Sequence, residues 1–406
     1  MPRHSPHRPA LRGLATRFFS LVLGAAVAGS LVVSMQLPLS HQAATSSVTL
    51  SALDPPAVSG TVAWPNVGSA ALVIPSLHVS ESWHNRVVPI ASLTKMMTAY
   101  VTLQKFPLAT GQNGPCVTVK TGDVSTYQTM LQTDQSNVAI AVGESLCEAD
   151  LLKGLLVHSA NNYASLLAVM VAGSVPAFVT LMNESARALG LDSTHYVDVS
   201  GFDAGSVSTA LDQGELAAVV MRSPLVRSLV MLPSVTLPIA GTVNSYTPYV
   251  GSDNVIGVKS GRTLAAGGCD VMAMTFPRGA SNGVLYAIVL GQRGGDLLGP
   301  AGTAALALAD SALRLQHRVV LGRGSVVAHV GWGSQRTAVV LTASHTVSWW
   351  SAQGTLPVSV QLRRFTSTIH RGDEVGWLVV RGVSVQRFAL SAQSTVSPPT
   401  LWQRLR

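Results

Sequence analysis

The segment Ala91-Ser-Leu-Thr-Lys-Met-Met-Thr-Ala-Tyr100 places a serine and a lysine three residues apart at the start of an apolar run. This pattern predicts a largely buried helix over 92–105, with Ser92 and Lys95 on one face and one turn apart. A lysine amine in that position can accept the serine proton when burial or a neighbouring cation destabilises its ammonium form. An ordinary capped core helix has the same pattern, so the motif needs support from elsewhere in the chain.

A second polar motif, His158-Ser-Ala-Asn-Asn162, interrupts an apolar stretch that predicts one helix over 149–171. Burying polar side chains without partners is costly. Ser159 and Asn161 therefore indicate either an exposed polar face or a functional site.

A third motif, Val258-Lys-Ser-Gly-Arg-Thr263, ends a short apolar strand. Gly261 would let a ligand backbone come close to this strand, although a strand-end turn with a solvated Lys259 is the simpler interpretation. Each of the three motifs alone has an ordinary structural explanation. All three in this order favour a single site.

Together the motifs resemble the S-x-x-K, S-x-N and K-T/S-G set of the serine D-alanyl-D-alanine carboxypeptidases, the low-molecular-mass penicillin-binding proteins. The likeness covers about residues 65–315 and includes further segments at 143–146, 151–156, 182–191 and 201–203. The region of Gly331-Trp-Gly333 is similar to the C-terminal domain of many members. The resemblance implies an α/β (α+β) fold: a β-lactamase/transpeptidase-like domain, with an antiparallel sheet, flanking helices and a helical region, followed by a small all-β domain.

The resemblance also implies a role for each site residue. Ser92 would attack the carbonyl between two D-alanines of a peptidoglycan stem peptide, with Lys95 as its base and Ser159 as proton relay to the leaving D-alanine. The substrate-binding residues would be Asn161, Lys259, Ser260, Gly261, Arg262 and Thr263. Asn161 would contact the substrate or Lys95, and Lys259 would supply positive charge near Lys95 and the substrate carboxylate. The strand at 259–261 would pair with the peptide, and the N–H groups of Ser92 and Arg262 would form the oxyanion hole.

Two positions depart from the family pattern. In Ser208-Thr-Ala-Leu-Asp212, Leu211 replaces an arginine that helps to hold the site and the terminal carboxylate, and Asn162 replaces an aspartate. Arg262 offers a substitute for the missing charge. The departures affect the expected rate and substrate preference more than the expected fold.

The net charge of the 406-residue chain, +8, is unevenly distributed. Residues 1–17 contain four arginines and no acidic residue, residues 314–406 contain eleven arginines and two acidic residues, and acidic residues outnumber basic ones over 18–313. An acidic centre with basic ends argues against nucleic-acid binding. Hydrophobic residues make up 47% of the chain, which excludes disorder from low hydrophobicity.

The arginine-rich leader over 1–17 precedes an apolar segment over 18–39, which predicts a signal peptide or a membrane anchor. The protein would then act on the extracytoplasmic face of the bacterial cell membrane or in the cell wall. Beyond it we expect a linker over 40–62, a penicillin-binding serine peptidase domain over 63–316, a β-rich domain over 322–398 and a tail over 399–406.

Cysteine and histidine usage fits an exported protein without a cofactor or metal. Cys116 and Cys147 can form a bridge in an oxidising exterior, which leaves Cys269 as a buried thiol. No cysteine pair has C-x-x-C spacing and the histidines are scattered, so no metal site is predicted.

Other functions remain as alternatives. A class A β-lactamase needs a Glu-x-x-Leu-Asn motif between the second and third motifs, and the sequence has none there. A D,D-endopeptidase would use the same site chemistry on cross-links. Because Leu211 replaces the expected arginine, a catalytically weak wall-binding membrane protein is one alternative. The arginine-rich C-terminal end predicts either binding of an anionic polymer or, as we favour, a solvated surface of the β module. β-lactam antibiotics would be inhibitors under the main hypothesis.

Overall fold

The computed structural model describes residues 43–48, 61–252, 254–278, 281–350, 358–381 and 385–400. A five-stranded antiparallel sheet, in the order β10-β11-β12-β2-β3, organises the region that holds the three motifs. Its strands are β2 (Ser69–Ile74), β3 (Val79–Trp83), β10 (Val255–Thr263), β11 (Gly267–Arg278) and β12 (Ser281–Gln292). Because β10 is the edge strand, one of its sides stays free of strand pairing within the described sheet.

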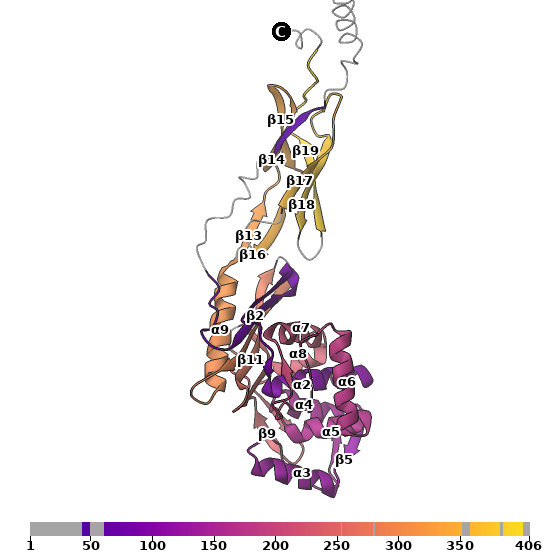
Figure 1. Ribbon diagram of the computed structural model, residues 1–406. Helices are drawn as coiled ribbons and strands as arrows, with labels where there is room; N and C mark the ends of the chain where they lie inside the picture. Colours follow the sequence, from indigo (N-terminus) through magenta and orange to yellow (C-terminus); the bar gives the residue numbers. More distant parts are fainter. Residues whose placement is uncertain are drawn as a thin grey trace, which may run out of the picture.

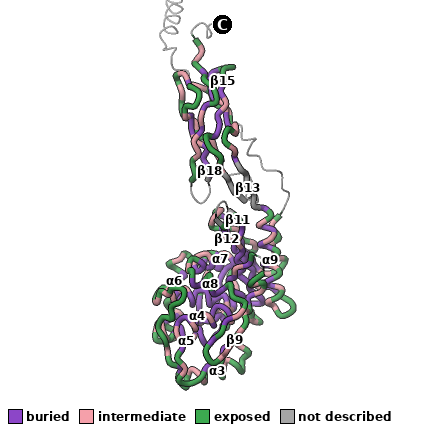
Figure 2. Tube along the Cα trace, turned by 180° about the vertical axis from the view of Figure 1, so that it is seen from behind, coloured by how far each residue is buried: buried purple, intermediate pink, exposed green. Residues whose placement is uncertain are grey.

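Helices cover both faces of this sheet, so β2 is buried along its whole length (Figure 1). Successive side chains of β2 point to opposite faces: Val73 packs in the core shared with the helical region, and Leu72 packs against α9 (Leu298–Arg314). The helical region contains α2 (Thr94–Lys105), α3 (Thr121–Gln132), α4 (Glu148–Leu156), α5 (Asn161–Ala172), α6 (Val175–Ala188), α7 (Ala210–Val220) and α8 (Pro224–Val230). Figure 2 shows buried residues throughout this interior, whereas α3 has none.

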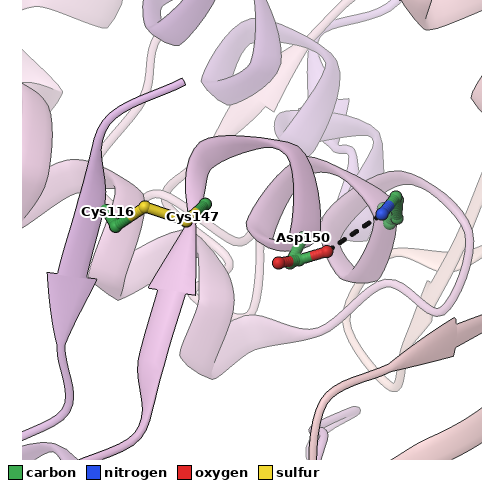
Figure 3. Close-up of polar contacts among 4 residues, drawn as sticks. Cys116, Cys147 and Asp150 are labelled. Carbon is green, nitrogen blue, oxygen red and sulfur yellow. Dashed lines mark hydrogen bonds and ion pairs between the residues drawn. A yellow bond between two sulfur atoms is a disulfide. The ribbon is translucent and has the colours of Figure 1, made fainter. Parts of the chain in front are cut away.

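Short two-stranded antiparallel pairs lie in the segments around these helices. They are β4 (Val88–Pro89) with β7 (Val207–Ser208), β5 (Cys116–Thr118) with β6 (Ser145–Cys147), and β8 (Ser234–Leu237) with β9 (Gly241–Asn244). Cys116 and Cys147 face each other across β5 and β6 and form a disulfide (Figure 3). Cys269 is a buried free thiol. The structure thus forms the bridge that the sequence allowed.

The helix predicted over 149–171 is wrong as one helix, because the chain breaks between α4 and α5. Ser159 lies in this break with a left-handed backbone, φ 62°. A Cβ at Gly154 would lie 2.5 Å from the ring of Tyr163, so the missing side chain lets α4 and α5 approach closely. The polar motif therefore begins a second helix instead of interrupting a longer one.

A second, all-β module follows α9 and lies beyond the sheet domain (Figure 1). Its six-stranded sheet has the order β1-β14-β15-β19-β18-β17, and its own apolar core includes Val327, Leu378 and Leu390. The strands are β14 (Val326–Trp332), β15 (Gln335–Leu341), β17 (Val358–Leu362), β18 (Glu374–Arg381) and β19 (Val385–Ala392). A separate pair is formed by β13 (Gln316–Leu321), which spans the interval between the two expected domains, and β16 (His345–Trp350), which lies within the expected β-rich domain.

The expected linker over 40–62 contains a strand that the sequence analysis missed. This strand, β1 (Thr45–Val48), pairs antiparallel with β14 and forms an edge of the C-terminal sheet. The Ala44 N–H also donates to the Phe365 carbonyl at 2.9 Å. A short Ser/Thr segment has no periodicity of its own, so its strand structure depends on the partner edge.

Within the described ranges, no single helix is both long and apolar enough to span a membrane. Helices α5 and α6 meet the length and composition criteria only as a pair, which is bent by 84°. The predicted leader over 1–17 and the apolar segment over 18–39 lie outside the described residues.

Candidate active site

The serine and lysine of the first motif are in direct contact. Ser92 lies in a 3-10 turn, Ala91–Leu93, that leads into α2, and Lys95 lies in the first turn of α2. The Lys95 Nζ is 2.8 Å from the Ser92 Oγ and donates a 2.9 Å hydrogen bond to the Ser200 carbonyl. These two contacts hold the amine against the hydroxyl.

The surroundings of Lys95 favour its neutral form. Lys95 is completely buried, and this burial together with the charge of Lys259 holds its pKa well below the ordinary value of 10.5. Asp198 acts in the opposite direction and raises it. A neutral amine next to a hydroxyl can act as a general base.

A loop that starts at Asp198 fixes the carbonyl that Lys95 contacts. The Asp198 carboxylate accepts hydrogen bonds from the hydroxyls of Ser200 and Ser206 and from the N–H groups of residues 200–202. Gly201 packs directly on the nucleophile's turn, because a Cβ there would lie 1.7 Å from the Ala91 carbonyl oxygen. The sequence analysis marked 201–203 by resemblance only and missed Asp198.

The second motif contributes a hydroxyl without a hydrogen-bond partner among the described residues, and it holds the loop over 133–138 in place. The Ser159 Oγ is buried and has no hydrogen-bond partner among the described residues. The Asn161 amide donates to the Gln135 Oε1 at 2.7 Å, so the expected contact with Lys95 is not the one observed. Asn162 makes two hydrogen bonds to the backbone of Val138 and thereby ties the 133–138 loop to α5.

The third motif passes immediately beside the nucleophile. A Cβ at Gly261 would lie 2.5 Å from the Ser92 backbone nitrogen, so this glycine lets β10 approach Ser92. Lys259 is completely buried, and burial lowers its pKa to about 7 while Asp270 opposes that shift. Its Nζ donates to the Ser260 carbonyl, and the Ser260 Oγ donates to the Tyr246 carbonyl at 2.9 Å.

Two adjoining cavities open at Ser92. The smaller, about 110 Å³, is lined by Ser159, Ser260 and Tyr246, and the larger, about 470 Å³, by Asn161, Phe202 and Thr263. Arg262 is exposed and lines both. The structure thus brings together every site residue predicted from the sequence: Ser92, Lys95, Ser159, Asn161, Lys259, Ser260, Gly261, Arg262 and Thr263. The lining residues Gln135, Ser136, Tyr246 and Leu264 were missed, and no motif pointed to them.

Leu211, which departs from the family pattern, packs against the helical core. Its N–H donates to the Asn85 Oδ1, and it is not among the described residues that line either cavity. Arg262 is the arginine among the described residues that line the two cavities. In the described part of the chain, no cluster of three or more His, Cys, Asp or Glu residues could hold a metal ion.

A serine paired with a buried lysine, between a helical region and an edge strand, defines the class of penicillin-binding serine peptidases. Residues 79–293 match the family model described as D-alanyl-D-alanine carboxypeptidase. The chain belongs to this family of serine peptidases, and it is a hydrolase.

Named relatives are similar to this chain in sequence, and a solved structure is similar to it in fold. A D-alanyl-D-alanine endopeptidase of Pseudomonas aeruginosa is 31% identical over 68% of this chain and 81% of its own length. The D-alanyl-D-alanine carboxypeptidase DacC of Escherichia coli is 39% identical over 31% of this chain and 32% of its own. The solved structure of penicillin binding protein 5 from Haemophilus influenzae has the same fold, with a TM-score of 0.57 at 20% identity, over 84% of this chain and 99% of that one.

Proposed function

We propose that this protein is a serine D-Ala-D-Ala carboxypeptidase that removes the terminal D-alanine of peptidoglycan stem peptides through an acyl-enzyme on Ser92. The observation that carries this proposal is the 2.8 Å contact between Ser92 Oγ and a buried Lys95 of lowered pKa. β-lactam antibiotics, which acylate the same serine in this class of proteins, are the expected inhibitors.

The reaction proceeds in two steps. Lys95 accepts the Ser92 proton as Oγ attacks the carbonyl carbon of the penultimate D-alanine, and the N–H groups of Ser92 and Arg262 stabilise the oxyanion. The C–N bond breaks as Ser159 passes a proton to the leaving amine, which releases D-alanine. Water then attacks the ester, returns the proton to Ser92 and frees the shortened stem peptide.

Charge at the smaller cavity supports binding of the leaving residue there. Arg262 lines this cavity and Lys259 lies buried in the same strand, which places positive charge near Ser159, while Asp134 is the acidic residue of the described lining. The free edge of β10 supports pairing of the peptide backbone with this strand.

The names of some relatives favour a second candidate function. The matched proteins of P. aeruginosa and E. coli are named D-alanyl-D-alanine endopeptidases. An endopeptidase differs only in its leaving group, which is the amine of a cross-link instead of free D-alanine. D-alanine release from pentapeptides, compared with cleavage of cross-linked dimers, distinguishes the two activities.

Export of the protein is part of the proposal. An arginine-only leader, an apolar segment over 18–39 and a disulfide all suit the extracytoplasmic face of a bacterial membrane or the cell wall. The N-terminal residue of the mature protein, identified by mass spectrometry, would separate a cleaved signal from a retained anchor.

Labelling with a fluorescent penicillin tests the nucleophile. The wild type and a control variant, Ser125→Ala on the exposed helix α3, should be labelled covalently, whereas Ser92→Ala should not. Labelling of a folded Ser92→Ala protein would contradict the assignment. Labelling without any turnover of peptides would instead favour a catalytically weak wall-binding protein.

A further inference from the structure

A carboxyl group that the proposed reaction does not use lies buried one strand away from the third motif. Asp270 is completely buried in β11, and the strand register places it directly opposite Ser260 of β10. Lys259 precedes Ser260 and is also completely buried. Two side chains that can carry opposite charges therefore lie near each other on neighbouring strands, away from solvent.

Asp270 lacks the partners that a buried carboxylate normally has. Neither of its oxygens makes a hydrogen bond of ordinary geometry with a described residue, although the adjacent Val271 N–H favours the charged form. Within the described part of the chain, no ion pair joins it to Lys259. A buried carboxyl group without partners is costly, so its presence calls for an explanation beyond packing.

The carboxyl and the ammonium act on each other through the sheet instead of by direct contact. Alternation along β11 places Asp270 on the same face as Met272, which packs against α9. Val271, the register partner of Lys259, packs instead in the core of the helical region. Because both charged groups are buried, their attraction is screened much less than the attraction between two exposed charges.

Each of the two groups opposes what burial does to the other. Burial raises the pKa of Asp270, and the charge of Lys259 lowers it. Burial lowers the pKa of Lys259, and the charge of Asp270 raises it. Other ionisable side chains on the elements packed around β11 include Arg262 in β10, Cys269 in β11 itself, Tyr286 in β12, Asp310 and Arg314 in the last two turns of α9, and Asp212 and Glu215 in α7.

The two buried groups therefore titrate as a pair. Groups that are coupled in this way lose their protons in steps that belong to the pair and not to either residue. With a carboxyl present, a proton can leave Asp270 while Lys259 keeps its ammonium, because each charge stabilises the other. Without the carboxyl, the only proton that the pair can lose is the one on Lys259.

We propose that Asp270 is a positioning residue of the active site, whose carboxylate keeps Lys259 charged over the pH range in which Ser92 reacts. The charged Lys259 then acts on Lys95 and on the substrate carboxylate. This inference rests on the proposed function. It gives a role to a residue outside the three motifs.

The pH dependence of penicillin acylation, measured as second-order rates from pH 5 to 10, tests the inference. In Asp270→Asn, Lys259 should lose its proton at a lower pH, so the alkaline limb of the profile should move to lower pH. Above the limb, the rate should fall about tenfold for each pH unit of that displacement. For peptides ending in D-Ala-D-Ala the loss should lie in KM, because the terminal carboxylate then meets a neutral amine.

Glu148→Gln is the matched control. Glu148, at the start of α4, is also completely buried, and neither of its carboxylate oxygens has a hydrogen-bond partner among the described residues. The control removes the same kind of group and should leave the alkaline limb in place. Asp270→Ala, a second neutral variant, should displace the limb in the same direction as Asp270→Asn, and Asp270→Glu should move it back toward the wild type.

Thermal unfolding distinguishes this role from a structural one. Asp270→Asn removes a costly buried carboxyl and should not lower Tm, whereas a structural role predicts a lower Tm and the same loss of rate at every pH. An alkaline limb at the wild-type pH in the folded Asp270→Asn or Asp270→Ala protein overturns the inference, and so does an equal displacement in Glu148→Gln. A wild type that penicillin does not acylate would overturn the proposed function instead.

Discussion

At Lys95, burial and two charged neighbours act on the charge of a single amine. Burial and Lys259 lower its pKa, while Asp198, which also fixes the Ser200 carbonyl, raises it. Lys259 therefore favours loss of the amine's proton, and Asp198 favours its retention. This balance decides the pH range in which Lys95 can accept the Ser92 proton.

The pH dependence of penicillin acylation tests this balance. The rate should rise with pH as Lys95 loses its proton, at a pH well below the ordinary lysine value. In Lys259→Gln, one cause of the lowered pKa is gone, so the Lys95 pKa rises and the acid limb should move to higher pH.

The comparison is made by measuring second-order acylation rates from pH 4 to 9. Lys153→Gln, which removes a half-buried lysine paired with Asp150 on α4, serves as the control and should leave the limb unchanged (Figure 3). An acid limb at the same or a lower pH in Lys259→Gln would contradict the role given to Lys259.

The sequence predicted the charged and nucleophilic residues of the site but not the residues that position them. Ser92, Lys95 and Lys259 lie in short motifs, and the three motifs in this order pointed to one site although none was sufficient alone. Asp198 acts through hydrogen bonds to a loop, and no spacing rule describes that arrangement.

At the scale of elements, the site depends on how closely β10 approaches the turn at Ser92. Gly261→Ala should push the strand away, because the new Cβ would lie 2.5 Å from the Ser92 nitrogen. A displacement of about 1 Å at a reacting centre costs on the order of 100-fold in rate. Penicillin acylation rates, with thermal unfolding as a folding check, measure the effect.

Gly122→Ala provides the matched control for this substitution. Gly122 lies in α3, and a Cβ there meets nothing within 4 Å. The change should leave acylation intact and stabilise the helix by about 0.5–1 kcal/mol. An equally small effect of Gly261→Ala on acylation would show that the close approach is unnecessary.

Element boundaries were the least predictable part of the fold. The apolar pattern over 149–171 suits one helix, whereas the chain breaks at Ser159, whose backbone is left-handed, and Gly154 lets the two resulting helices approach closely. β1 has the composition of a linker, and its strand structure comes from pairing with residues nearly 300 positions later. Such long-range pairing leaves no trace in the local sequence.

At the scale of the whole molecule, β1 links the beginning of the described chain to the C-terminal module. A protein that starts at residue 61 should lose this edge strand, because β14 then has no partner on that side. For a module of 60–100 residues, each kcal/mol lost lowers Tm by about 4–8 °C. Calorimetry should show a lower transition temperature for the module. Penicillin labelling should be unchanged.

A protein that starts at residue 43 is the control for this truncation, and its module should unfold without the lowered transition temperature. Equal transitions for the two proteins would mean that β1 adds no stability. Loss of penicillin labelling in the shorter protein would mean that the module and the active site are not independent, although their apolar cores are separate.

The pairing of β1 with β14 also sets an order of events during synthesis. Thr45 and its partner Gly331 are separated by 286 residues, and the chain emerges from the ribosome N-terminus first. The peptidase domain can therefore fold before β1 pairs with β14. Closing so long a loop is slow. The first described strand to be made is among the last to join its sheet.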